Sequence, residues 1–280
     1  MSAYHRPRTL AEALAIRAET GALPLAGGTD IHALRTARAA WGDPWRPEIL
    51  DLSAVRDLDG IAETAEGWRI GARTTWTMIA ETPLPPLFDG LRTAAREVGG
   101  RQVQNRGTIA GNLVTASPAG DGIPNLLVLD AEVELASAGA TRRLPVAQFL
   151  TGYRSTALLP GEIVTALHIP RCDGARSRFE KLGARRYLVI SIAMAAGVIR
   201  LEGDRVAEAR IAVGACSPVA RRLPALENAL TGLHPSEMPH VPQHAHLAPL
   251  APIDDVRASA AYRSDAALTL LRDLLAGLLR

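Results

Sequence analysis

The chain has 280 residues, 48% hydrophobic and 21% charged, which is typical of a soluble globular protein with one elaborate domain or two smaller ones. This composition excludes disorder as the main state. The formal charge is only +2 and acidic and basic residues alternate along the chain, so no nucleic acid or other polyanion is indicated as a partner.

Cysteine content and apolar runs restrict the class further. Cys172 and Cys216 are too few for a disulfide scaffold or for an iron–sulfur cluster, which usually needs about four. The N-terminal residues lack the basic and then apolar pattern of a signal peptide. The longest apolar run, Tyr187 to Ile199, is shorter than the roughly 20 residues that span a bilayer. We therefore expect a cytoplasmic protein with no cluster, no metal site and no membrane span.

The first quarter of the chain predicts a helix, then a strand, a glycine turn and a second helix. Helical spacing of apolar residues covers Thr9 to Arg17, and Leu23 to Ala26 forms a short apolar strand. Gly27 and Gly28 follow, and helical spacing resumes at Ile31. The next expected elements are strands over Glu48 to Leu52 and Trp68 to Ala72, a short helix over Trp76 to Ala80 capped by Thr74, and a helix over Leu87 to Val98.

The turn at Gly27 and Gly28 can approach an anion closely. Exposed N–H donors of a first helical turn and the positive end of the helix dipole favour phosphate. A tight turn capped by Thr29 or Asp30 is the alternative interpretation, because many helices begin in that way.

The segment from Arg101 to Asp121 is dense in Gly, Asn, Thr, Ser and Pro and has no sustained apolar period. It predicts a long structured loop, and loops beyond about 12 to 15 residues are usually functional. Its backbone donors, hydroxyls, amides and carboxylate suit a diphosphate and a polyol. Neither this segment nor the first turn contains GxGxxG or GxxxxGK, which disfavours a Rossmann site and a P-loop.

The second half of the chain predicts an antiparallel sheet and helices. Strands are expected over Glu132 to Ala136 and Glu162 to Ile169, and the polar turn from Arg171 to Ser177 suggests a domain boundary. Beyond that turn we expect strands over Phe179 to Leu182, Val189 to Leu201 and Val206 to Gly214, a hairpin turn at Gly203 and Asp204, and helices over Ala220 to Leu230 and Ser259 to Leu279.

Four histidines crowd a proline-rich stretch: His234, His240, His244 and His246. Their spacing matches no regular ligand pattern such as HExxH. We interpret the stretch as an extended connector to the last helix, with a metal site as the less favoured alternative.

LAGGTD (25–30) and RGTIAGNLVTASPAGD (106–121) together resemble the FAD-binding medium subunit of the molybdenum hydroxylases, the xanthine dehydrogenase and aerobic carbon monoxide dehydrogenase family. The resemblance covers nearly the whole chain. It includes RPEILDLSAVRDLDGI (46–61), WRIGARTTW (68–76), LLPGEIVTALHIP (158–170), FEKLGAR (179–185) and VRASAAYR (256–263).

The resemblance implies an α+β fold in two parts. Residues 1–170 would form a two-lobed FAD-binding domain of the vanillyl-alcohol-oxidase/PCMH type, with lobes of about 1–55 and 56–170 and FAD between them. Residues 171–280 would form the C-terminal domain of the carbon monoxide dehydrogenase flavoprotein type, with a three-stranded antiparallel sheet and helices.

The resemblance also implies the FAD-binding residues, and no catalytic residue or metal ligand among them. Ala110 stands where the family usually has the first glycine of its second loop. The implied residues are Leu25, Ala26, Gly27, Gly28, Thr29, Asp30 and Ile31 around the diphosphate, Thr108, Ile109, Ala110, Gly111 and Asn112 in the second loop, Ser117 and Asp121 at its end, and Val164 and Lys181 along the flavin ring.

Lys181 is the only lysine among the 31 basic residues. An ammonium group near a flavin carbonyl would stabilise negative charge on the reduced ring, and a solvated surface lysine is the alternative. Tyr187 is the nearest aromatic candidate for stacking on the ring.

The resemblance implies an electron-transfer subunit whose FAD takes electrons from [2Fe–2S] clusters on a small partner subunit and passes them to an external acceptor. A large partner would carry molybdopterin, and the complex would be a dimer of heterotrimers. One alternative is a self-sufficient FAD-dependent oxidase or dehydrogenase of a small substrate, and another is a scaffold subunit that has lost FAD. The sequence leaves the organic substrate and the final acceptor (NAD, oxygen or a quinone) open.

Overall fold

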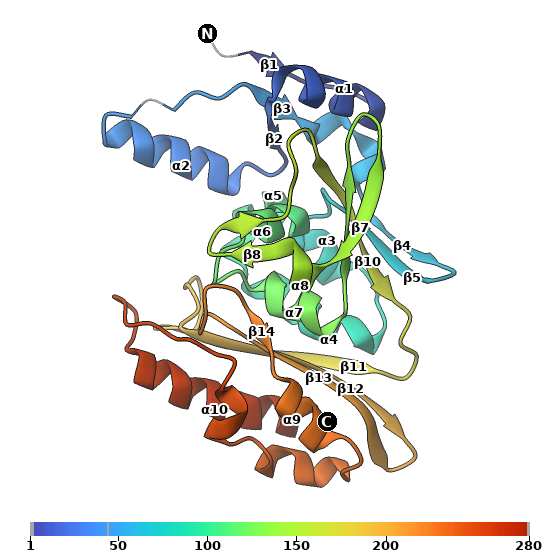
Figure 1. Ribbon diagram of the computed structural model, residues 1–280, viewed down its shortest axis with the longest axis vertical. Helices are drawn as coiled ribbons and strands as arrows, with labels where there is room; N and C mark the ends of the chain where they lie inside the picture. Colours follow the sequence, from blue (N-terminus) through green and yellow to red (C-terminus); the bar gives the residue numbers. More distant parts are fainter. Residues whose placement is uncertain (1–2, 44, 279–280) are drawn as a thin grey trace.

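The computed structural model describes residues 3–43 and 45–278, and Figure 1 shows three parts in chain order from one end to the other. An N-terminal lobe lies at one end and a mixed middle part follows it. At the other end a long antiparallel sheet is covered by helices. The chain is thus a mixed helix and sheet protein, as expected.

The N-terminal lobe is a small parallel sheet, in the order β1-β3-β2, with two helices. The hydroxyl of Thr9 caps α1, and Gly21 ends that helix in the left-handed conformation. Helix α1 buries Ala13 and Leu14 within the apolar core of the lobe, whereas α2 buries none of its residues. The helix, strand and glycine-turn predictions for residues 9–40 are therefore confirmed. The elements are β1 (Tyr4–His5), α1 (Leu10–Thr20), β2 (Leu23–Leu25), α2 (Thr29–Ala40) and β3 (Ile49–Asp51).

The middle part combines a five-stranded antiparallel sheet, in the order β4-β5-β10-β6-β7, with short helices. Apolar residues of both contribute to the largest core of the molecule, which includes Ile70, Trp76 and Phe88. The strands and longer helices are β4 (Ile61–Thr64), β5 (Gly67–Gly71), α3 (Trp76–Glu81), α4 (Asp89–Glu97), α7 (Gly122–Val128), β6 (Glu132–Ala136), β7 (Thr141–Pro145) and β10 (Ile163–Pro170). Shorter elements are α8 (Val146–Phe149), β8 (Leu150–Gly152) and β9 (Ser155–Thr156), besides 3-10 turns at Leu52–Ala54, Arg56–Leu58 and Pro86–Phe88.

The prediction of a long loop over residues 101–121 is wrong. Two short helices occupy most of the segment, α5 (Arg101–Arg106) and α6 (Ile109–Thr115). Buried Ile109 and Leu113 attach α6 to the core, so packing stabilises a helix whose composition does not favour one.

The C-terminal part is a sheet in the order β11-β12-β13-β14 with helices on one face. Alternate residues of β12 enter different cores: Ala195 packs with Leu274 of α10, and Ala196 packs with the middle part. Burial on both faces explains the continuous apolar run in this strand. The elements are β11 (Arg176–Leu182), β12 (Ala193–Glu202), β13 (Arg205–Gly214), β14 (Arg221–Arg222), α9 (Pro224–Leu230), 3-10 turns η4 (Pro235–His240) and η5 (His244–Leu247), and α10 (Ala260–Gly277).

Two details of this part differ from expectation. The sheet has a fourth strand, β14, because Arg221 and Arg222 pair with the end of β13. The strand expected from Val189 begins only at Ala193. Leu188 has a positive φ of 54°, and Leu188 and Ile190 are exposed, so the apolar residues before Ala193 form a loop.

No helix in the described parts of the chain is long and apolar enough to cross a membrane. Two histidines of the proline-rich stretch have capping roles. Nδ1 of His234 accepts a hydrogen bond from the backbone N–H of Ser236, and Nδ1 of His246 accepts one from that of Gln243. No cluster of three or more metal-binding side chains is found among residues 3–43 and 45–278.

Candidate functional site

The first glycine segment joins β2 to α2. Gly28 is the residue before the helix and has a φ of 75°, which glycine adopts without strain. No side chain caps the first turn of α2, so its backbone N–H groups remain available to a ligand. Thr29 and Asp30 belong to that turn, and the Thr29 hydroxyl lies 3.3 Å from the Asp30 carboxylate. The sequence offered both as capping residues, but neither side chain caps α2.

Gly27 lies directly against the second segment. A Cβ atom at Gly27 would be 1.8 Å from the carbonyl oxygen of Arg106 and 3.0 Å from the nitrogen of Gly107. No side chain can fit in that space. The two segments that the sequence singled out, about 80 positions apart, therefore meet backbone to backbone.

The flanking residues of the first segment line a separate cavity of about 300 Å³. Leu25 is buried at the end of β2, and Ile31 is half-buried in α2. The cavity lies between α2 and the N-terminal sheet, and its other lining residues are Ala3, Tyr4, His32, Arg35, Trp45, Arg46, Pro47 and Ile49.

The second segment presents the start of α6. The Thr108 hydroxyl accepts a hydrogen bond from the N–H of Gly111 at 3.1 Å and so caps this helix. Ile109 and Ala110 are buried in the core of the middle part, so they support the segment from the interior of the molecule. A Cβ atom on Gly111 would meet the Thr108 hydroxyl at 2.9 Å. Asn112 is half-buried on the same short helix.

The end of this segment carries Ser117 and Asp121. The Ser117 hydroxyl accepts a hydrogen bond from the N–H of Ala119 at 3.3 Å and shapes the turn before α7. Asp121 is buried, and its side chain points toward the C-terminal part of the molecule, where both its partners lie.

Asp121 and Lys181 form a buried ion pair. The Lys181 ammonium donates to one carboxylate oxygen at 2.5 Å, and the Ser191 hydroxyl donates to the other at 2.6 Å. Only 6% of each charged side chain is exposed. Burial raises the pKa of the Asp121 carboxyl, and the adjacent ammonium opposes that shift. Lys181 is therefore not a solvated surface lysine, and a hydroxyl that the sequence did not single out completes the pair.

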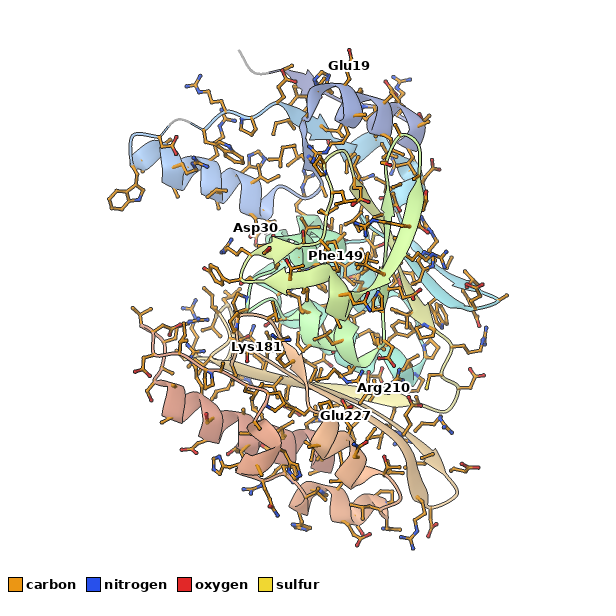
Figure 2. All side chains as sticks on the ribbon, in the orientation of Figure 1. Glu19, Asp30, Phe149, Lys181, Arg210 and Glu227 are labelled. Carbon is orange, nitrogen blue, oxygen red and sulfur yellow. The ribbon has the colours of Figure 1, made fainter. Side chains whose placement is uncertain are left out.

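Lys181 lines a cavity of about 140 Å³ on the side of the molecule where Asp30 also lies (Figure 2). Tyr187, the aromatic residue expected near the ring, lines the same cavity and is mostly exposed. Sequence reasoning missed Arg96, Glu97 and Gly99, although it predicted the end of a helix here, at Val98. The full lining is Arg96, Glu97, Gly99, Lys181, Arg186, Tyr187, Leu188 and Val189.

Glu97 adds a titratable group to this cavity. Partial burial raises the pKa of its carboxyl, the charge of Lys181 lowers it, and the charges of Asp121 and Glu180 raise it. The Lys181 ammonium is thus near two carboxylates, Glu97 in the cavity wall and the buried Asp121 with which it is paired.

Val164 does not line the cavity that holds Lys181, as far as the structure describes its walls. It is buried in β10 opposite Leu135, next to a β-bulge, within the core that also contains Ile109 and Ala110. Its place is therefore behind the second segment.

Helix α5 sets the separation of the two polar regions. The cavity includes Gly99, just before the helix, and the contact with Gly27 is at Arg106 and Gly107, at its other end. Six residues of α-helix span about 9 Å. A backbone cradle for an anion and a charged cavity at this separation fit a ligand with a diphosphate and a flat ring system, such as FAD.

Known families match the chain in two successive stretches. The family described as FAD binding domain in molybdopterin dehydrogenase matches residues 1–172, and the one described as CO dehydrogenase flavoprotein C-terminal domain matches residues 178–278.

Individual relatives agree with these matches. The nicotinate dehydrogenase FAD-subunit of Eubacterium barkeri is 36% identical over 197 residues, which are 68% of this chain and 65% of that protein. The putative xanthine dehydrogenase FAD-binding subunit of Escherichia coli is 32% identical, over 79% of this chain and 76% of that protein. The structure of carbon monoxide dehydrogenase from Hydrogenophaga pseudoflava superimposes with a TM-score of 0.88 at 27% identity, covering 99% of this chain and 97% of that one.

The fold and its glycine segments define a flavoprotein of the oxidoreductases. The chain belongs to the FAD-binding subunits of the molybdenum hydroxylases, the family with xanthine and carbon monoxide dehydrogenases. The family, the class of enzyme and FAD as the cofactor are thereby confirmed.

Proposed function

We propose that this chain is the electron-transfer subunit that receives electrons from [2Fe–2S] clusters on a small partner and passes them to an external acceptor. FAD, when bound, supplies the redox chemistry, and the chain supplies binding, orientation and charge. The observation that carries the proposal is the backbone contact of Gly27 with Arg106 and Gly107, one short helix away from the Lys181 cavity.

The proposed roles follow the geometry. The first turn of α2, with Gly27 and Gly28, binds the diphosphate through backbone N–H groups, and α6 bounds the same space. Lys181 orients the ring system in the cavity and places a positively charged ammonium group beside the ring. Asp121 acts by holding Lys181, and Ile109, Ala110 and Val164 support the second segment from the core. Tyr187 is the stacking candidate.

We further propose that residues 1–170 form the FAD-binding domain, with lobes of about 1–55 and 56–170, and that residues 171–280 form the C-terminal domain. The family matches at 1–172 and 178–278 support a division near the turn after β10. The apolar core around α10, made up of residues after Leu182, supports a C-terminal unit. The core around α1, which also includes Ala136 and Ile163, supports the N-terminal lobe.

The partners proposed are a small iron–sulfur subunit and a large molybdopterin subunit, assembled as a dimer of heterotrimers in the cytoplasm. The relatives named as medium chains of carbon monoxide dehydrogenase and of glyceraldehyde dehydrogenase support a multi-subunit complex.

Acid precipitation of the purified chain tests the binding part of the proposal. We expect FAD in the supernatant, because no His or Cys lies within residues 25–31 or 108–112 for covalent attachment. FMN in the supernatant, flavin in the pellet or a colourless protein that does not take up FAD would contradict it.

Reduction assays test the electron-transfer part. A small aldehyde, alcohol or purine should reduce the flavin only when co-purified partner chains are present. Reduction of the isolated chain by such a substrate would instead support a self-sufficient oxidase or dehydrogenase.

A further inference from the structure

The motif VRASAAYR (256–263) lies in the C-terminal part and has no role in the site described so far. Its last residue, Arg263, belongs to the first turn of α10 and is only 1% exposed. The Arg263 guanidinium donates to the carbonyl of Ile192 at 2.6 Å, to that of Ala215 at 3.0 Å and to the Asp255 carboxylate at 2.6 Å. A buried arginine thus donates hydrogen bonds to backbone carbonyls near the start of β12.

Arg257 makes a parallel set of contacts. Its guanidinium donates to the carbonyl of Ser191 at 2.9 Å and to Asp255 at 2.6 Å. The Asp255 carboxylate therefore joins two arginines that hold consecutive carbonyls, those of Ser191 and Ile192. The hydrogen bonds from Arg257 and Arg263 lower the pKa of the Asp255 carboxyl and so favour its ionised form.

The held segment leads directly to the flavin cavity. Ser191 is fully buried, and its hydroxyl donates to Asp121, which in turn accepts from Lys181. The segment also ends the loop that contributes Tyr187, Leu188 and Val189 to the cavity. Residues 255–263 are therefore connected to the ammonium in the cavity through Ser191, whose carbonyl accepts from Arg257 and whose hydroxyl donates to Asp121.

We propose that Asp255, Arg257 and Arg263 are positioning residues that hold Ser191, and through it Asp121 and Lys181, at the flavin ring. The proposal rests on the proposed function, since that function places the ring beside Lys181. Charge-assisted hydrogen bonds to backbone carbonyls are strong and directional. A buried carboxylate that loses one donor has an unsatisfied lone pair, so its position relative to the remaining partner changes.

The composition of the chain offers a direct probe, because Lys181 is its only lysine. Protein labelled with ¹³C at the lysine ε-carbon gives one lysine signal, which can be measured without FAD. The test variants are Arg257→Met, which removes the contact with Ser191 from a partly exposed side chain, and Ser191→Ala, which cuts the link to Asp121. The matched controls are Arg205→Met, a mostly exposed arginine on β13, and Ser177→Ala, a buried serine bonded to Gly90.

We expect the Lys181 signal to move in both test variants and to stay unchanged in both controls. In FAD-loaded protein, the reduced-to-oxidised flavin ratio at a fixed potential should fall about tenfold in Ser191→Ala, which corresponds to ~30 mV for a two-electron couple. A general loss of stability would not move the potential in this way, because Ser177→Ala also loses the hydrogen bond of a buried serine.

An unchanged Lys181 signal in folded Arg257→Met would overturn the proposal, because that variant removes the arginine contact and keeps Ser191. If the Lys181 signal moves in the test variants but the parent protein does not bind FAD, the hydrogen-bonded connection is confirmed and the proposed function is wrong. Equal midpoint potentials in Ser191→Ala and Ser177→Ala would show that Lys181 does not lie beside the flavin ring.

Discussion

The two halves of the proposed flavin site are built from different parts of the polypeptide. The glycine segments meet through backbone atoms, with Gly27 against Arg106 and Gly107, at the half-exposed start of α2. The cavity at the other end of α5 depends on side chains, above all the buried pair of Asp121 and Lys181. Consequently the first half is sensitive to any added atom, and the second half is sensitive to any lost partner.

Because of this difference, we expect one half of the site to determine FAD affinity and the other half to determine the redox properties of bound FAD. Substitutions in the glycine segments should remove FAD with a modest effect on the rest of the fold. Substitutions at the ion pair should change the stability of the chain and the properties of FAD that still binds.

The largest effect is expected for Gly27→Ala. The new methyl group would lie 1.8 Å from the carbonyl oxygen of Arg106, so the two segments must separate. We expect FAD affinity to fall more than about 100-fold, the equivalent of roughly 3 kcal/mol, as measured by fluorescence titration of the apo protein. Gly139→Ala is the control, because open space surrounds that glycine. Normal FAD affinity in Gly27→Ala would contradict the backbone contact.

Asp121→Asn should have the next largest effect, on stability. It leaves the buried Lys181 ammonium without its carboxylate, and breaking a buried pair in this way costs about 3–5 kcal/mol. Lys181→Met leaves the carboxylate unpaired and should cost a similar amount. Urea unfolding of the apo proteins at neutral pH measures both changes.

The double variant Asp121→Asn/Lys181→Met distinguishes a coupled pair from two independent residues. We expect it to be more stable than either single variant, since no unpaired charge stays buried. Additive losses would show that the two charges do not depend on each other.

Thr108→Ala tests the contribution of the cap on α6. The hydroxyl that accepts from Gly111 is lost, and removal of such a cap costs about 1 kcal/mol. FAD affinity should fall only a few-fold, because α6 bounds the diphosphate site without being its main donor. Thr269→Ala, on an exposed part of α10, is the control. A loss of FAD as large as that in Gly27→Ala would move the principal donors from α2 to α6.

The contrast between the two halves also explains what the sequence could reveal. Gly27 and Gly28 were readable because a strand, a glycine pair and a helix follow each other locally. Asp121 and Lys181 lie 60 positions apart, so their contact depends on the tertiary packing that brings the start of α7 to the end of β11. Lys181 was singled out by the family resemblance and as the only lysine, whereas Ser191 carried no such signal.

The failures of secondary-structure prediction have similar causes. Helices α5 and α6 have six and seven residues, too short to form without tertiary packing. The apolar residues Leu188 and Ile190 resemble the start of a strand, yet they are exposed in a loop beside the cavity. In both places the site, rather than local propensity, determines the conformation.

The smallest effect concerns Glu97 and depends on pH. Burial raises the pKa of this carboxyl above its usual value of 4.5, so the folded protein binds a proton more tightly than the unfolded chain. The stability that Glu97 contributes is therefore complete below pH 4.5 and is lost as the pH rises through the higher folded-state pKa. Glu97→Gln stays neutral, so at pH 7 the variant should unfold at a higher urea concentration than the parent protein. Because the side chain is partly exposed, solvent screening limits the gain to about 0.5 kcal/mol.

The advantage should disappear near pH 4, and Glu19→Gln, at an exposed position of α1 (Figure 2), should show no such change. An advantage of equal size at both pH values would mean that the amide improves packing and that the charge of Glu97 has no part in it.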